Sequence, residues 1–154
     1  MEYDFGGQFE IGKQGVEILK GLTAGCIDYL NDMDKQKRGI DLFIPGVGYV
    51  EVKTDTTEYE NVFLEVDTEG RPGGIFNSRA DWLYMVFIKQ GVVFSVSLPR
   101  VQHWLAQHYG LLNSTCRRTI VSRRGKARWT VGGFIVSRAV LVEEIGAKEE
   151  TYAE

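Results

Sequence analysis

The sequence contains little that would support a disulfide framework, a zinc site or a membrane span. Its 154 residues include two cysteines, Cys26 and Cys116, which lie far apart and form no CxxC pair. This usage argues against a cysteine-based zinc site and fits a reducing cytosol. No apolar run approaches the roughly 20 residues that a helix needs to cross a bilayer, and the polar start MEYDFGGQFE is no secretory signal. We therefore expect a cytoplasmic protein with no membrane partner.

A second absence concerns charge of one sign, because no acidic residue lies between Asp81 and Glu143. That segment contains nine Lys or Arg residues, whereas residues 1–81 contain sixteen acidic and eight basic residues. Residues 143–154 are acidic again, with five Glu and one Lys. A long basic segment in an acidic protein favours a polyanionic partner. The alternative is that its arginines neutralise the acidic half within the fold.

Length and composition indicate one folded domain with a substantial core, since 44% of residues are hydrophobic and 25% are charged. The sequence shows no repeat and no P-loop spacing, so a P-loop nucleotide site is not expected. Hydrophobic periodicity and turn residues predict the following order. It comprises a helix over 9–30, a polar loop over 31–38, a hairpin over 39–55, a strand over 61–66, a Gly-rich loop over 67–80, strands over 80–89 and 92–98, a helix over 99–109, a β region over 117–136, and a frayed tail after residue 146.

The hairpin GIDLFIPGVGYVEVKTD, residues 39–55, carries three charged residues within an apolar pattern. Glu51 and Lys53 are two apart, so on a strand they share one face. A three-residue loop, Pro45–Val47, would put Asp41 on that face as well, whereas a four-residue loop would put it on the opposite face. The shorter loop therefore predicts two carboxylates and a lysine in one patch.

Such a patch suits a hard divalent cation, because Mg²⁺ is commonly held by one or two carboxylates together with substrate phosphates. The lysine could orient or activate water, or stabilise negative charge on a phosphate. A further carboxylate from Glu10, Glu17 or Glu65 could complete the site, although each is equally consistent with a solvated side chain. The alternative for the whole hairpin is a surface element with a salt bridge.

A family resemblance rests on this hairpin, because Asp41 followed after nine residues by Glu51-Val52-Lys53 resembles the D…(D/E)xK motif of the PD-(D/E)XK nuclease superfamily. The helix with Glu17 resembles the superfamily's first helix, whose acidic residue often joins the metal site. The stretches GKQGVEILKGL and RGIDLFIP are similar to small phage-type and resolvase-like members. The resemblance covers roughly residues 9–110, and Ile40 departs from it by occupying the position of the proline in the superfamily name.

The resemblance implies an α/β fold in which a mixed β-sheet is flanked by helices. It implies a restriction-endonuclease-like αβββαβ core over about 9–110, within a single domain spanning 1–154. The basic β-rich region 117–142 would then be a C-terminal β extension, followed by an acidic tail over 143–154. If a phage encodes the chain, the host cytoplasm is the expected location.

The resemblance also implies a metal-dependent DNA endonuclease that hydrolyses phosphodiester bonds. Such an enzyme could be structure-specific or could resolve Holliday junctions. Asp41, Glu51 and the Val52 carbonyl would bind Mg²⁺ or Mn²⁺, and Glu17 would complete the shell directly or through water. Lys53 would position or polarise the attacking water. A junction-resolving enzyme would act as a homodimer. The alternatives are a non-catalytic or partner-dependent DNA-binding module on a nuclease-like fold, and a structural or assembly protein.

The residues expected to contact the nucleic-acid backbone are basic, because arginine and lysine side chains suit phosphate. One group precedes the hairpin and the other surrounds a predicted basic turn in the last β region. They are Lys37 and Arg38, and Arg117, Arg118, Arg123, Arg124, Lys126 and Arg128.

Overall fold

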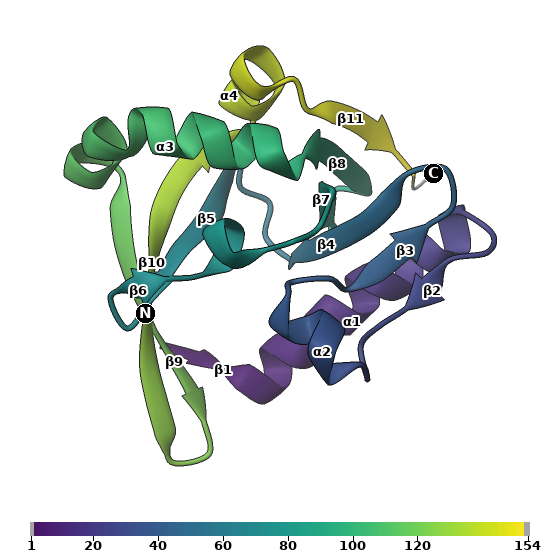
Figure 1. Cartoon of the computed structure of the whole chain (residues 1–154), viewed down its shortest axis with the longest axis horizontal. Coiled ribbons are helices and arrows are strands. Elements are labelled where there is room, and N and C mark those ends of the chain that lie inside the picture. The colour runs from purple at the N-terminus through teal and green to yellow at the C-terminus, as the bar shows by residue number, and fades with distance from the viewer. Residues whose placement is uncertain (1, 153–154) are drawn as a thin grey trace.

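The computed structural model describes residues 2–152, with side chains from Glu10 onward. Two long helices and several short ones surround two β-sheets (Figure 1). The helical elements are α1 (Phe5–Leu22), α2 (Met33–Lys37), the 3₁₀ helix η1 (Gly74–Asn77), α3 (Leu98–Thr115), α4 (Arg138–Val140) and the π-helical turn η2 (Leu141–Ile145).

Six strands form a mixed sheet that includes the predicted hairpin. Its order is β11 (Lys148–Thr151), β8 (Val92–Ser97), β7 (Trp82–Phe87), β4 (Gly48–Asp55), β3 (Leu42–Ile44) and β2 (Ile27–Asp28). β4 and β7 run parallel, whereas the other neighbouring pairs in this order are antiparallel. The predicted α/β class, with a mixed sheet flanked by helices, is therefore confirmed.

Five strands form a second sheet, in the order β1 (Glu2–Asp4), β9 (Arg117–Arg124), β10 (Ala127–Ser137), β5 (Asn61–Thr68) and β6 (Arg71–Pro72). β1 and β9 are parallel and the remaining pairs are antiparallel. The chain leaves the mixed sheet after β4, crosses the second sheet as β5, and returns as β7. Parallel strands require a long crossover connection, and here that connection supplies a strand to the opposite sheet.

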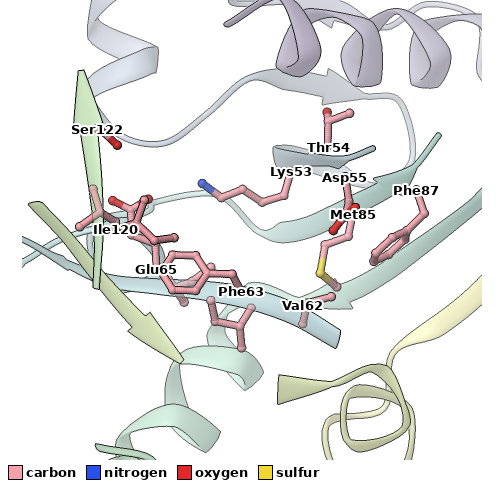
Figure 2. A pocket seen from close by; sticks show the side chains of 13 residues that line it. Lys53, Thr54, Asp55, Val62, Phe63, Glu65, Met85, Phe87, Ile120 and Ser122 are labelled. Atoms are coloured by element: carbon pink, nitrogen blue, oxygen red, sulfur yellow. The ribbon is translucent and has the colours of Figure 1, made fainter. Parts of the chain in front are cut away.

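The mixed sheet is the middle layer of the molecule. One face packs on α1, where Val16 and Leu19 contact Val50 and Val52. The other face looks toward the second sheet and α3, and Lys53 extends from it into a cavity between the two sheets (Figure 2). Successive strand residues point to opposite faces, so Val50 and Val52 lie under α1 while Glu51 and Lys53 face the second sheet.

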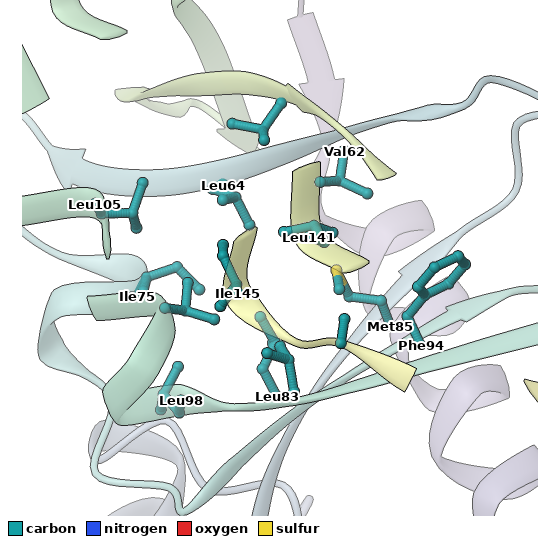
Figure 3. Packing of buried hydrophobic residues seen from close by; sticks show 14 of the residues in the cluster. Val62, Leu64, Ile75, Leu83, Met85, Phe94, Leu98, Leu105, Leu141 and Ile145 are labelled. Carbon is teal, nitrogen blue, oxygen red and sulfur yellow. The ribbon is translucent and has the colours of Figure 1, made fainter. Parts of the chain in front are cut away.

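The main hydrophobic core fills the space between the two sheets and α3. Leu64 of β5, Leu83 of β7 and Leu105 of α3 are almost fully buried there, beside Leu141 and Ile145 of η2 (Figure 3). Full burial of one such side chain stabilises the folded state by about 1.5–3 kcal/mol. This core fixes the second sheet against the mixed sheet and so fixes the width of the cavity between them.

Several predicted elements are confirmed. The loop Pro45–Val47 has three residues and sets Ile44 opposite Gly48, which is the register on which the clustered charges depend. β7 and β8 form the predicted antiparallel pair, and β9 and β10 are joined at the predicted basic turn.

Other predicted elements differ from the structure. The strand predicted beside the hairpin, β5, pairs instead with β10 in the second sheet, because Val62, Leu64 and Val66 bury their side chains in the main core. The predicted polar loop 31–38 contains α2, whose start is capped by the Asp32 side chain accepting from the Lys35 N–H. The predicted frayed tail pairs with β8 as β11.

The helix predicted over 9–30 begins earlier and ends at Leu22. None of the helices in the described chain is long and apolar enough to cross a membrane.

Candidate active site

The candidate site forms where β3 stops pairing with β4. β3 begins at Leu42, opposite Val50, so β4 has an open edge beyond that point. Asp41 lies just outside β3, and its N–H donates to the Val50 carbonyl at 2.9 Å. Its carboxylate then accepts the Val52 N–H at 2.8 Å. The Asp41 carboxylate therefore accepts the hydrogen bond that a longer β3 would have accepted, and this bond fixes the carboxylate at the edge of β4.

Glu51 and Lys53 extend from β4 beside this carboxylate. Glu51 is 6% exposed, and its Oε1 lies 3.2 Å from Lys53 Nζ. Its other oxygen, Oε2, is buried and has no hydrogen-bond partner among the described residues. Buried carboxylate oxygens are normally satisfied by donors or cations. The orphaned oxygen therefore fits a position that a cation would fill.

A third oxygen donor is available from the backbone of β4. In a strand, the N–H and C=O of one residue point to the same side, so the Val52 carbonyl shares the open edge with the Asp41 carboxylate. Within the part of the chain whose side chains are described, no three Asp, Glu, His or Cys residues form a metal-binding group. A cation here would rely on two carboxylates with backbone and substrate oxygens, which is a usual environment for Mg²⁺.

Gln36 of α2 holds Asp41 in place. Its Nε2 donates to Asp41 Oδ1 at 3.2 Å and also lies 3.1 Å from the carbonyls of Tyr29 and Ile40. Sequence reasoning missed this residue, because nothing in the polar run 31–38 distinguishes it from its neighbours. The one available signal was the capping residue Asp32, which marks the helix on which Gln36 lies.

The ionisable groups of the site perturb one another. Burial raises the pKa of Asp41, and the negative charge of Glu51 raises it further. Hydrogen bonds from the Val52 N–H and Gln36 and the positive charge of Lys53 lower it, but the net shift is upward. The Glu51 carboxylate raises the pKa of Lys53, and Glu65 and Asp41 add to this increase, while burial opposes it. Lys53 therefore keeps its proton at neutral pH and acts as a fixed cation.

The site opens into a cavity of about 470 Å³, lined by Asp41, Glu51 and Lys53 together with residues of α1. We call it the catalytic cavity after its candidate role. Lys13 of α1 also lines this cavity and adds a positive charge that the sequence motif did not indicate. From the opposite wall, Glu65 of β5 reaches the same cavity, with Thr68 Oγ1 donating to its Oε1 at 3.2 Å. The three motif residues of the predicted hairpin thus share one cavity.

The structure does not bring Glu17 to this site, although the sequence resemblance placed it in the metal shell. The Glu17 side chain is 54% exposed and lies 3.2 Å from Lys20, which also pairs with Asp28. Val16 and Leu19 form the face of α1 that packs on the sheet, and Glu17 lies off that face. Glu10 is likewise exposed and does not line the cavity, so Glu65 is the predicted accessory carboxylate that does reach it.

Most of the predicted basic residues of the last β region lie on the β9–β10 hairpin, which projects from the body of the molecule (Figure 1). The exposed members are Arg118, Arg123, Arg124, Lys126 and Arg128.

Arg117 differs from these residues, because its Nη2 lies 2.7 Å from Asp67 Oδ2 of β5. This ion pair crosses β10 above Gly132, where a Cβ would collide with both side chains. Arg117 therefore has a structural role within the second sheet, where it neutralises one carboxylate of the acidic half. Its contact with nucleic acid stays a prediction.

The second predicted basic group lies at the end of α2, where Lys37 and Arg38 are exposed. The Arg38 carbonyl accepts the N–H of Arg79 at 2.7 Å. Arg79, which is also exposed, therefore lies next to this group. Sequence reasoning missed Arg79 because it follows a Gly-rich loop far from α2 in the chain.

Comparison of the chain with protein-family models, curated proteins and solved structures found no match. Any function is therefore argued from the site itself: two carboxylates, one protonated lysine and an orphaned buried oxygen at the open edge of β4.

Proposed function

We propose that this protein is a metal-dependent DNA endonuclease of the PD-(D/E)XK type, which hydrolyses phosphodiester bonds. One observation carries the proposal. Asp41, Glu51 and Lys53 share one cavity, and Glu51 Oε2 is buried there with no hydrogen-bond donor among the described residues. The restriction-endonuclease-like arrangement of the core is part of the same proposal, and it is supported by α1 preceding the β3–β4 hairpin that carries the motif.

The carboxylates of Asp41 and Glu51 and the Val52 carbonyl would hold Mg²⁺ or Mn²⁺. When bound, such an ion polarises the phosphodiester and lowers the pKa of a coordinated water. Gln36 and the Val52 N–H orient Asp41 for this task. Lys53 is held protonated by Glu51 and Glu65, so it would stabilise the negative charge that develops on the phosphate rather than remove a proton from water.

The exposed basic residues would hold the polymer. The β9–β10 hairpin and the Lys37–Arg38 end of α2 supply cations on different elements around the catalytic cavity. Contacts of this kind neutralise phosphates and release counterions, so affinity should fall as salt rises. They would position the backbone without selecting a base sequence.

A cleavage panel tests the proposal. Single-stranded, duplex, nicked and four-way-branched DNA would each be incubated with the purified protein in Mg²⁺, in Mn²⁺ and in EDTA. The proposal predicts cleavage of at least one form in Mg²⁺ or Mn²⁺, no cleavage in EDTA, and loss of cleavage in Lys53→Ala. Salt-sensitive binding without cleavage in any metal would identify a DNA-binding module instead, and absence of binding would favour a structural protein.

A further inference from the structure

A second cavity lies beside the catalytic one, between the two sheets, and we call it the inter-sheet pocket. Its volume is about 290 Å³, and its walls come from β4, β5, β7, β9 and β10. Figure 2 shows the Lys53 side chain extending toward Glu65 at one end, while Met85 and Phe87 lie toward the other. Asp55 lies at the same end as Met85 and Phe87, so each end of the pocket combines apolar side chains with a carboxylate.

The inter-sheet pocket adjoins the candidate active site. Lys53, Thr54 and Glu65 line both cavities. Lys53 Nζ also lies 3.2 Å from Glu51 Oε1, one of the carboxylate oxygens of the site. A ligand whose phosphate occupies the catalytic cavity therefore has the pocket within reach of the group attached to that phosphate.

The lining of the pocket suits a flat ring with polar edges. Phe63 from one sheet and Met85 from the other supply apolar surface, and Ile120 of β9 closes a further side. Glu65 and the Ser122 hydroxyl can accept hydrogen bonds from ring N–H groups near the entrance. A volume of about 290 Å³ is at the lower end of ligand pockets, which fits one ring system. Nucleobases that enter enzyme pockets are held in this way, by apolar stacking and edge hydrogen bonds.

We propose that the inter-sheet pocket binds one unstacked nucleobase next to the phosphate held at Asp41 and Glu51. This inference rests on the proposed nuclease function and narrows its substrate class to nucleic acid with unpaired nucleotides. A base inside a duplex must leave the stack before it can enter such a pocket, whereas an unpaired base enters without that energetic cost.

Side chains on β9 alternate between the two faces of the second sheet, and this alternation allows a matched pair of variants. Ile120 and Ser122 line the pocket, whereas the residues between and beside them point to the other face of the sheet. Ser122→Trp would fill the pocket from its entrance. Thr119→Trp places the same side chain on the exposed opposite face of the same strand and serves as the control. Phe63→Ala, which removes a stacking surface without filling the pocket, is a second variant if Ser122→Trp does not fold, as judged by circular dichroism.

Photocrosslinking in EDTA tests the pocket without requiring catalysis. The probe is a single-stranded oligothymidylate in which 5-iododeoxyuridine replaces thymidine, and crosslinked peptides are identified by mass spectrometry. We expect crosslinks to Phe63 or Met85 that fall at least tenfold in Ser122→Trp but persist in Thr119→Trp. In Phe63→Ala, the crosslink to Met85 should fall to the same extent. Crosslinks confined to the β9–β10 hairpin, or undiminished in both pocket variants, would overturn the proposal. Complete displacement of the probe by equimolar thymidine monophosphate would show that a free nucleotide, not a strand, is the ligand.

A cleavage arm separates this proposal from the one on which it rests. A duplex with one unpaired nucleotide and the same duplex fully paired would be compared in Mg²⁺. We expect at least tenfold faster cleavage of the first, with the preference lost in Ser122→Trp and kept in Thr119→Trp. Cleavage that depends on Mg²⁺ and Asp41 but shows no such preference would reject the pocket and leave the nuclease standing. Pocket crosslinking without cleavage in any metal would reject the nuclease while keeping the pocket as a base-binding site.

Discussion

The catalytic cavity and the inter-sheet pocket together form what we call the cleft, and the two sheets are its walls. The two walls carry their charges in different environments. On the mixed sheet, Glu51 is buried and Asp41 is half-buried, and their environment raises the pKa of Asp41 and of Lys53. On the second sheet, the basic residues of the β9–β10 hairpin are exposed. Interactions between buried charges are strong and little affected by salt, whereas interactions of exposed charges are weaker and are screened by salt. Under the proposed function, the first wall would carry out the chemistry and the second would bind the polymer.

The sharpest test of this division is Asp41→Ala. We expect Mg²⁺-dependent cleavage to fall by at least roughly 10²–10³-fold, the range for loss of one preorganised electrostatic group. DNA affinity measured in EDTA by fluorescence anisotropy should stay within about twofold of the parent value, because phosphate contacts made by other residues dominate affinity. Unchanged cleavage by the purified variant would remove Asp41 from the site.

Gln36→Leu should affect the same wall less severely. Loss of the Gln36–Asp41 hydrogen bond is expected to weaken Mn²⁺ binding by about 10–100-fold, as for other residues that orient metal ligands. Isothermal titration calorimetry with Mn²⁺ measures the effect, and Lys37→Ala on the same short helix is the control. Equal Mn²⁺ affinity in the two variants would show that Gln36 does not position Asp41 for a cation.

Charge reversal on the other wall should produce the opposite pattern. Arg123→Glu combined with Arg124→Glu is expected to weaken DNA binding by roughly tenfold on all sequences alike and to flatten its salt dependence. The rate of cleavage at saturating DNA should change little, because neither residue lines the catalytic cavity. An unchanged affinity and salt slope would show that the hairpin does not contact the backbone.

Arg117→Ala separates the arginine that pairs with Asp67 from the arginines on the same strand that are proposed to bind DNA. It leaves Asp67 without its partner, so the free energy of unfolding should fall by about 1–2 kcal/mol after allowance for the partial exposure of Arg117. Urea denaturation followed by circular dichroism measures this loss. A DNA affinity that falls as much as in the double hairpin variant would contradict the structural role.

The smallest expected effect concerns stability without metal. The folded-state pKa of Asp41 is raised, so this group contributes a loss of stability as pH rises through that pKa, where the buried carboxylate becomes charged. Asp41→Asn removes the charge and should raise the melting temperature in EDTA at pH 7.5 by roughly 2–4 °C, equivalent to about 1 kcal/mol. The difference should vanish at pH 4, and Mg²⁺ should stabilise the parent protein alone. A lower melting temperature for the variant at pH 7.5 would contradict this.

Local sequence patterns predicted the hairpin of the site, whereas its surroundings depend on long-range pairing. The residues Pro45–Val47 fix a three-residue loop, and that loop fixes which side chains face the second sheet. Periodicity could not show that β5 pairs with β10, because an amphipathic strand does not specify its partner. Glu65 was therefore predicted as a possible accessory carboxylate, but its position on the second sheet was not.

The position of Glu17 outside the cavity could have been predicted, because the relevant information was local. Val16 and Leu19 define the buried face of α1, and a residue directly after Val16 is rotated by about 100° from it. The family resemblance favoured Glu17 as a ligand, whereas the helical phase places it beside Lys20.

The crossover between β4 and β7 has a consequence for how the protein is made. The strand that bears Glu51 and Lys53 is completed only when β7 joins it, and the intervening chain must by then dock as β5 against β10. Because β10 ends at Ser137, a nascent chain still missing that region cannot enclose the cleft between the two sheets. Pairings of such long sequence separation form late in folding. The cleft therefore forms on a nascent chain only after the residues up to Ser137 have been synthesised.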